Sequence, residues 1–193
     1  PQVAYICNPN NPTGQIISPG KILYFAKKFS NTAFIIDEAY YEFSSVTCSD
    51  IVNSQKNIII SRTLSKAFGL ASARIGYLIA NEYVIQMLKK IKNHKSISSF
   101  AQITALAALS DLNYIENYKK NISEGKQYFC KWLEIRNYDH TIGEGNFVLV
   151  DFLERKNDIV EFLRLNNIFV RKYDHVSGMS SYVRVTIGTK EMM

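Results

Sequence analysis

The first third of the chain alternates short, continuously apolar runs with one amphipathic segment. The runs VAYIC (3–7), AFIID (33–37) and NIIIS (57–61) predict strands, and their continuous hydrophobicity predicts burial on both faces of a sheet. Between the first two, Ser18-Pro19 is typical of a helix start and predicts a helix over 19–29. The strand–helix–strand order favours a parallel sheet covered by helices.

In the remainder of the chain, the predicted elements change near residue 130 from mainly helices to a mixture of strands and helices. We expect a strand at 73–80, a helix at 82–93, and a helical stretch over 99–135 with few breakers before Gly125. Further on, the pattern predicts strands at 146–152, 168–173 and 182–188 and a helix at 157–167. We therefore divide the chain into part of a large domain (1–98), a linking helical region (99–129) and a smaller α+β domain (130–193).

Composition and charge narrow the function only slightly. The chain is 47% apolar with a net charge of +6, and its basic residues are scattered, as on a solvated surface. The three cysteines form no CxxC, and His94, His140 and His175 lie far apart, so no metal site is expected. No apolar run approaches the ~18–20 residues that span a bilayer. We expect neither a membrane nor a nucleic acid as partner.

Polar residues follow each of the three apolar strands in the first part of the chain. The strands lead into CNPNNPTG, DEAYYEF and SRTLSK. In open parallel sheets, ligands bind beyond the carboxyl ends of the strands. We therefore expect Asn11, Asp37, Tyr40 and Lys66 to face one crevice.

Four stretches together carry a family resemblance: NPNNPTG (8–14), IIDEAYYEF (35–43), RTLSKAFGLASARIGY (62–77) and VRVTIGT (183–189). They resemble the signature stretches of fold-type I pyridoxal-phosphate aminotransferases, and histidinol-phosphate aminotransferase is the most similar subgroup. The resemblance implies an α/β fold, with a mostly parallel sheet flanked by helices and a smaller α+β domain. It also implies pyridoxal 5'-phosphate as cofactor, with an amine donor and a 2-oxo acid acceptor as substrates.

The same resemblance assigns roles around the cofactor ring. Lys66 is the residue that would form the Schiff base, a role that requires a nucleophilic primary amine. Asp37 would pair with the pyridine nitrogen and keep it protonated, which makes the ring a better electron sink. Tyr40 and Asn11 would donate hydrogen bonds to the 3-oxygen of the cofactor.

Other matched residues would hold the phosphate and the substrate. Arg74, eight positions after Lys66, matches the arginine that grips the cofactor phosphate, because a planar guanidinium suits bidentate binding. The hydroxyls of Thr63 and Ser65 would bind the same phosphate, or cap a helix instead. Arg184 resembles the arginine that binds the substrate carboxylate, and Asn146 a small-domain asparagine near the substrate.

Three further features follow from the comparison with the family. The Asn11–Pro12 peptide is expected to be cis. Gly69 is expected to permit close backbone approach. The roles of Arg62 and Arg171 stay open.

The resemblance covers nearly the whole chain but not the whole family pattern. The family's amino-terminal part and its C-terminal helix are expected to be missing, and NHKSISSF (93–100) replaces a proline-rich segment near the substrate. A phosphorylated amino acid, an amino alcohol or another amine thus all remain as substrates. Three alternatives to an aminotransferase stay open: a decarboxylase of a phosphorylated amino acid such as threonine phosphate, the aminotransferase-like domain of a transcription regulator, and a catalytically inactive fragment. The resemblance also implies a homodimer, and we expect a cytoplasmic location.

Overall fold

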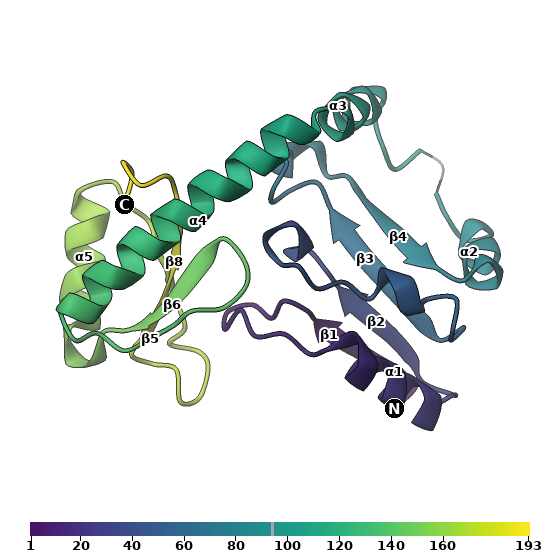
Figure 1. Cartoon of the computed structure of the whole chain (residues 1–193), viewed down its shortest axis with the longest axis horizontal. Coiled ribbons are helices and arrows are strands. Elements are labelled where there is room, and N and C mark those ends of the chain that lie inside the picture. The colour runs from purple at the N-terminus through teal and green to yellow at the C-terminus, as the bar shows by residue number, and fades with distance from the viewer. Residues whose placement is uncertain (94) are drawn as a thin grey trace. The chain divides into compact units, whose positions relative to one another are not determined.

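The chain divides into two compact units, each of which has its own sheet. This computed structural model describes residues 1–93 and 95–193. His94, which belongs to the 93–100 segment named above, lies outside the described residues. Unit 1 comprises Pro1–Asn11 and Gln15–Tyr118, and unit 2 comprises Pro12–Gly14 and Lys119–Met193 (Figure 1).

The sheet of unit 1 has four strands in the order of the chain. These are β1 (Val3–Cys7), β2 (Ala33–Asp37), β3 (Ile58–Thr63) and β4 (Gly76–Ala80). β1, β2 and β3 are parallel, whereas β4 runs antiparallel to β3 at the edge. The mostly parallel α/β sheet expected from the sequence is confirmed.

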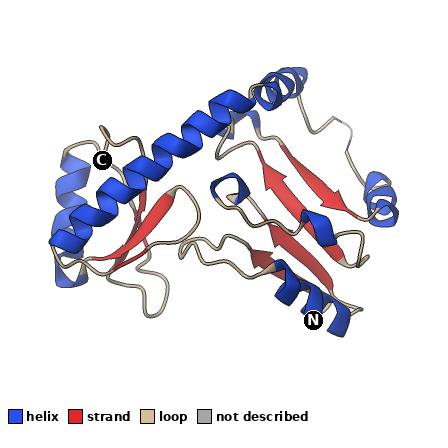
Figure 2. Ribbon diagram, in the orientation of Figure 1, coloured by secondary structure: helices blue, strands red, loops and turns tan. Residues whose placement is uncertain are grey.

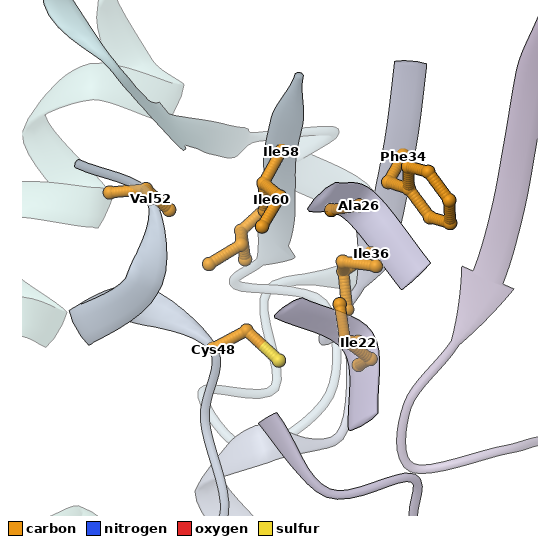
Figure 3. Packing of buried hydrophobic residues seen from close by; sticks show 8 residues of the cluster. All are labelled: Ile22, Ala26, Phe34, Ile36, Cys48, Val52, Ile58 and Ile60. Carbon is orange, nitrogen blue, oxygen red and sulfur yellow. The ribbon is translucent and has the colours of Figure 1, made fainter. Parts of the chain in front are cut away.

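The core of unit 1 lies on one face of this sheet. Helix α1 (Pro19–Lys28) begins with the Ser18 side chain accepting a hydrogen bond from the Lys21 amide, as the sequence predicted. Alternate residues of β2 and β3 point to α1 and to the 48–52 segment, because successive side chains of a strand face opposite ways. Figure 3 shows the resulting cluster of buried side chains: Ile22, Ala26, Phe34, Ile36, Cys48, Val52, Ile58 and Ile60.

The opposite face of the same sheet departs from the sequence-based expectation. Val3 and Tyr5 on β1 are 54% and 63% exposed, and Ile35 and Ile59 are only partly buried. Continuous apolar runs predicted burial on both faces, but α1 and the 48–52 segment cover only one of them. Within the described chain, the expectation is therefore wrong for this second face.

The connection between β3 and β4 is more irregular than the expected strand at 73–80. A short 3-10 helix, η3 (Ala71–Ala73), ends at Arg74, whose φ of 52° is left-handed. A β-strand cannot include this backbone conformation, so β4 begins at Gly76. Gly76 also lies tightly against β3, since an added Cβ would be 2.5 Å from the Arg62 carbonyl oxygen.

The helical stretch expected over 99–135 is two helices. After α2 (Glu82–Lys89) come α3 (Ser99–Ser110) and α4 (Leu112–Ile135), separated by Asp111. Asp111 ends α3 in a non-helical conformation, and its carboxylate accepts a hydrogen bond from the Tyr114 amide at 3.0 Å. Aspartate is a favoured N-cap residue, so one side chain both ends one helix and begins the next. The division between the two units falls within α4, after Tyr118.

Unit 2 has a small antiparallel sheet in the order β5-β6-β8-β7. Figure 2 draws strands in red and helices in blue. Its strands are β5 (His140–Thr141), β6 (Phe147–Asp151), β7 (Arg171–Lys172) and β8 (Tyr182–Thr186), and α5 (Lys156–Leu165) lies between β6 and β7 in sequence. The expected strand at 168–173 shortens to two residues, and β5 was not predicted. A cavity of about 890 Å³ is lined by side chains of α4, α5 and β8.

In the described part of the chain, none of the helices has the length and apolar character that crossing a bilayer requires.

Candidate active site

The carboxyl ends of the three parallel strands lie together along one side of the sheet in unit 1, across the strands rather than beside the edge strand β4. Cys7 at the end of β1 is the register partner of Asp37 at the end of β2. Asp37 in turn pairs with Ser61 of β3, two residues before the end of that strand. The polar loops that follow these strands therefore leave the sheet at the same edge, where ligands bind in open parallel sheets.

The carboxylate of Asp37 is held by one backbone and one side-chain donor. The Ala39 amide donates to its Oδ1 at 3.0 Å, and the Tyr5 hydroxyl donates to its Oδ2. Although the Tyr5 side chain is 63% exposed, partial desolvation raises the pKa of its phenol well above the usual value, and the hydrogen bond to Asp37 and its negative charge raise it further. Sequence reasoning missed Tyr5, although it faces the same side of the sheet as Cys7, two residues on.

Lys66 and Tyr40 come together although they lie on different loops. The Lys66 ammonium is 5.4 Å from the centre of the Tyr40 ring, within the range of a cation–π contact. Tyr40 is only 4% exposed, which fixes the ring, while Lys66 is exposed. The structure thus places the amine next to the loop that follows Asp37.

The hydroxyls of Thr63 and Ser65 interact within their own turn. The Thr63 Oγ1 donates to the Ser65 Oγ at 2.9 Å and accepts from the Ser65 amide at 3.1 Å. Serine and threonine hydroxyls often bond to the backbone of their own turn, and in the described chain no helix begins at these residues for them to cap. The Arg74 guanidinium donates to the Ala71 carbonyl at 3.1 Å and is exposed. Gly69 has a φ of +68°, and in the described chain no atom lies within 4 Å of an added Cβ, so backbone conformation is what favours glycine there.

The loop after β1 corrects one expectation. The cis peptide bond that the described chain contains is Asn8–Pro9, not Asn11–Pro12. Both bonds are Asn-Pro, so local sequence does not distinguish them. Asn8 is buried and its side chain is fixed by Ile17, accepting from the Ile17 amide at 2.8 Å and donating to its carbonyl at 3.0 Å. Asn11 is exposed in the same loop.

The two expected substrate residues lie in unit 2. Asn146 precedes β6, and its carbonyl accepts a hydrogen bond from the Ile187 amide at 2.8 Å. Arg184 is on β8, opposite Leu149 of β6 and Arg171 of β7, with its guanidinium 5.3 Å from the centre of the Phe147 ring. The approach of these residues to Lys66 stays a prediction.

Sequence reasoning left the role of Arg62 open, and the structure places it in a buried cluster. Its Nε and Nη2 donate to the Glu38 Oε2 at 3.0 and 2.9 Å, and its Nη2 also donates to the Thr47 hydroxyl. Burial acts to lower the pKa of Arg62, but hydrogen bonds to Tyr77 and Glu38 raise it overall. The signal available in the sequence was the position of Arg62 between the strand NIIIS (57–61) and Thr63 of the candidate site.

The family match and the relatives of this chain agree, because both are aminotransferases. Residues 1–193 match the family described as aminotransferase class I and II. A dihydroxyacetone phosphate transaminase of Campylobacter jejuni is 42% identical over 199 residues, covering 100% of this chain and 53% of that protein. The chain spans about half the length of the curated relatives it matches.

Two solved structures extend the comparison. The crystal structure of histidinol-phosphate aminotransferase from Sinorhizobium meliloti in complex with pyridoxal-5'-phosphate matches with a TM-score of 0.86 and 30% identity, covering 97% of this chain and 52% of that one. L-threonine-O-3-phosphate decarboxylase from Porphyromonas gingivalis matches with a TM-score of 0.80 at 20% identity, covering 99% and 61%. The second match shows a shared fold.

Proposed function

This chain belongs to the aminotransferase class I and II family, and on that premise we propose that its protein is a pyridoxal-phosphate-dependent aminotransferase. The family match and the relative with bound pyridoxal-5'-phosphate support that cofactor. When bound, pyridoxal phosphate supplies an aldehyde that accepts amines and a ring that withdraws electrons. The observation that carries the proposal is the common sheet edge at which Asp37, Tyr40 and Lys66 follow neighbouring strands.

The donor set at this edge fits the chemistry of the cofactor. Lys66 provides a primary amine, and Asp37 a carboxylate fixed by the Ala39 amide. Thr63 and Ser65 provide hydroxyls in one turn, and Arg74 a guanidinium on the loop from β3 to β4. Amine, carboxylate and phosphate-binding groups are the set that an aldehyde, a pyridine nitrogen and a phosphate require.

Each residue then has a defined task. The Lys66 Nζ would hold the cofactor aldehyde until the substrate amine displaces it, and the released amine would then move a proton to and from the substrate Cα. Asp37 holds a proton at the ring nitrogen, and Tyr40 and Asn11 orient the 3-oxygen. Thr63, Ser65 and Arg74 hold the phosphate.

The residues of unit 2 complete the proposal. Arg184 binds the substrate carboxylate and Asn146 lies near the substrate. Both assignments rest on the family resemblance.

For the substrates, we propose a small phosphorylated amine as the amine donor and a 2-oxo acid as the acceptor. The relatives from Campylobacter jejuni and Sinorhizobium meliloti are named for dihydroxyacetone phosphate and histidinol phosphate, and both names specify a phosphate. A homodimer and a cytoplasmic location stay predictions of the resemblance. An assay that measures both amino transfer and carbon dioxide release distinguishes the proposal from decarboxylation.

The direct test is covalent labelling of Lys66 in the full-length protein. We expect pyridoxal phosphate to produce a visible absorbance band, and borohydride to fix the label on Lys66 in a peptide identified by mass spectrometry. Lys66→Ala removes the only amine with this role, so it should abolish both the band and the label.

Lys56→Ala is the matched control, because the Lys56 ammonium also lies over a tyrosine ring, 5.6 Å from the centre of Tyr83. It should label like the wild type. Equal labelling of Lys66→Ala and the wild type, or a label on another lysine, contradicts the proposed function.

A further inference from the structure

The buried pair Arg62–Glu38 lies directly beside two residues of the proposed site in sequence. Glu38 follows Asp37, and Arg62 precedes Thr63. The side chain of Glu38 is 0% exposed and that of Arg62 is 10% exposed. A buried carboxylate requires partners, since desolvating a charge without compensation is costly.

The oxygens of Glu38 have several donors besides Arg62. The Cys48 amide donates to Oε1 at 2.6 Å, and the Thr47 hydroxyl lies 2.8 Å from Oε2. The Arg62 Nη2 donates to the same hydroxyl at 2.6 Å, and its guanidinium stacks 3.5 Å from the centre of the Tyr41 ring. These contacts join the end of β2, the end of β3 and the 47–48 segment.

Backbone hydrogen bonds reinforce this connection at the sheet edge. The Glu38 amide donates to the Ser61 carbonyl at 2.9 Å, and the Asn8 amide donates to the Asp37 carbonyl at 2.8 Å. The peptide segments that carry Asp37 and Thr63 are thus fixed both through the backbone and through the Arg62–Glu38 pair.

We propose that Arg62 and Glu38 are positioning residues that hold the Asp37 carboxylate and the Thr63 turn at a fixed separation for the cofactor. This inference rests on the proposed function. A buried ion pair often adds little net stability compared with apolar side chains, so orientation is a more specific role for it. Arginine suits that role because one planar group reaches Glu38 through two nitrogens and Thr47 through one of them, which lysine cannot reproduce.

The test measures cofactor affinity and thermal stability separately in the full-length protein. We expect Arg62→Lys and Glu38→Gln to raise the dissociation constant for pyridoxal phosphate about 10–100-fold, by analogy with the loss of metal affinity when the hydrogen-bond partners of metal ligands are removed. The absorbance band of the bound cofactor should also shift. A double variant, Arg62→Met with Glu38→Leu, removes both charges together and so leaves no charge unpaired. It should fold, and it should bind pyridoxal phosphate more weakly than the wild type does.

Asn57→Ala is the matched control at the opposite edge of the sheet. The side-chain Nδ2 of Asn57 donates to the carbonyls of Ala26, Phe29 and Thr32, so its loss destabilises unit 1 without touching the proposed site. It should lower the melting temperature yet leave the dissociation constant within about twofold of the wild type.

The outcomes distinguish this inference from the proposed function. If the wild type forms no label on Lys66, the proposed function and this inference both fail. If the wild type is labelled but Arg62→Lys and Glu38→Gln bind the cofactor normally, the positioning role alone is overturned. The positioning role is also overturned if Asn57→Ala weakens cofactor binding as much as Arg62→Lys and Glu38→Gln do.

Discussion

Tyr5 shows how one residue outside the recognised motifs changes the environment of a residue inside them. Its hydroxyl donates to the Asp37 carboxylate from a strand 32 positions away in sequence. Asp37 was predicted from its motif, but its donor was not. The contact depends on the pairing of β1 with β2, which the motif itself does not contain.

The Asp37 charge should be visible in the titration of Tyr5. Asp37→Asn removes the negative charge, so the pKa of the Tyr5 phenol should fall towards the usual tyrosine value. Ultraviolet difference absorbance measures this titration, and Tyr5→Phe assigns it. Asp50→Asn, which changes an aspartate outside this contact, should leave the titration unchanged. An unaltered Tyr5 titration in Asp37→Asn would contradict the contact.

Helix α4 illustrates a conflict between helix propensity and packing at the scale of an element. Gly125 lies inside this helix, where glycine is ordinarily about 0.5–1 kcal/mol less favourable than alanine. An added Cβ at Gly125 would be 2.2 Å from the Gly188 carbonyl oxygen, a backbone atom. Close packing of α4 against the 188–189 segment therefore explains the glycine.

Alanine substitutions at two helical glycines should accordingly have opposite signs. Gly125→Ala should lower the free energy of unfolding by about 1–3 kcal/mol, because the clash is with backbone. Gly20→Ala, in α1 with no atom within 4 Å of the added Cβ, should raise it by up to about 1 kcal/mol. Urea denaturation measures both. Stabilisation by Gly125→Ala would show that α4 does not pack as described.

At the scale of the whole molecule, the core of unit 1 couples its stability to alkaline pH. Burial raises the pKa of the Cys48 thiol to about 12, and the Glu38 charge adds to this effect. Burial also raises the pKa of Tyr41 to about 12, with a contribution from its hydrogen bond to Tyr77. Both groups thus hold their protons more tightly in the folded state than in the unfolded chain.

The free energy of unfolding should therefore fall as pH rises from about 9 to about 12. In that window the unfolded thiol has lost its proton while the folded thiol keeps it, so the unfolded state gains relative stability. Denaturation curves at a series of pH values measure the slope. Cys48→Ala should make this slope shallower, whatever its effect at neutral pH. An identical slope in Cys48→Ala would refute the coupling.

The sequence predicted the elements best where the physical signal is local. The strand at 3–7 and the one at 33–37 were recognised from their apolar runs, and α1 from its cap and periodicity. The break at Asp111 was missed because helical periodicity continues on both sides of it. The late start of β4 was missed because nothing in ARIGYLIA indicates the left-handed conformation of Arg74.

The sequence by itself determined the types of the main elements and the family, and it predicted the residues whose chemistry suits the cofactor. Only the tertiary structure decided that Asn8–Pro9 is the cis bond, that Tyr5 donates to Asp37, and that Arg62 pairs with Glu38. The reason is the range of the interactions. Caps, turns and periodicity involve near neighbours, whereas these side-chain contacts join residues 24 to 32 positions apart, and the register of a sheet must form before they exist.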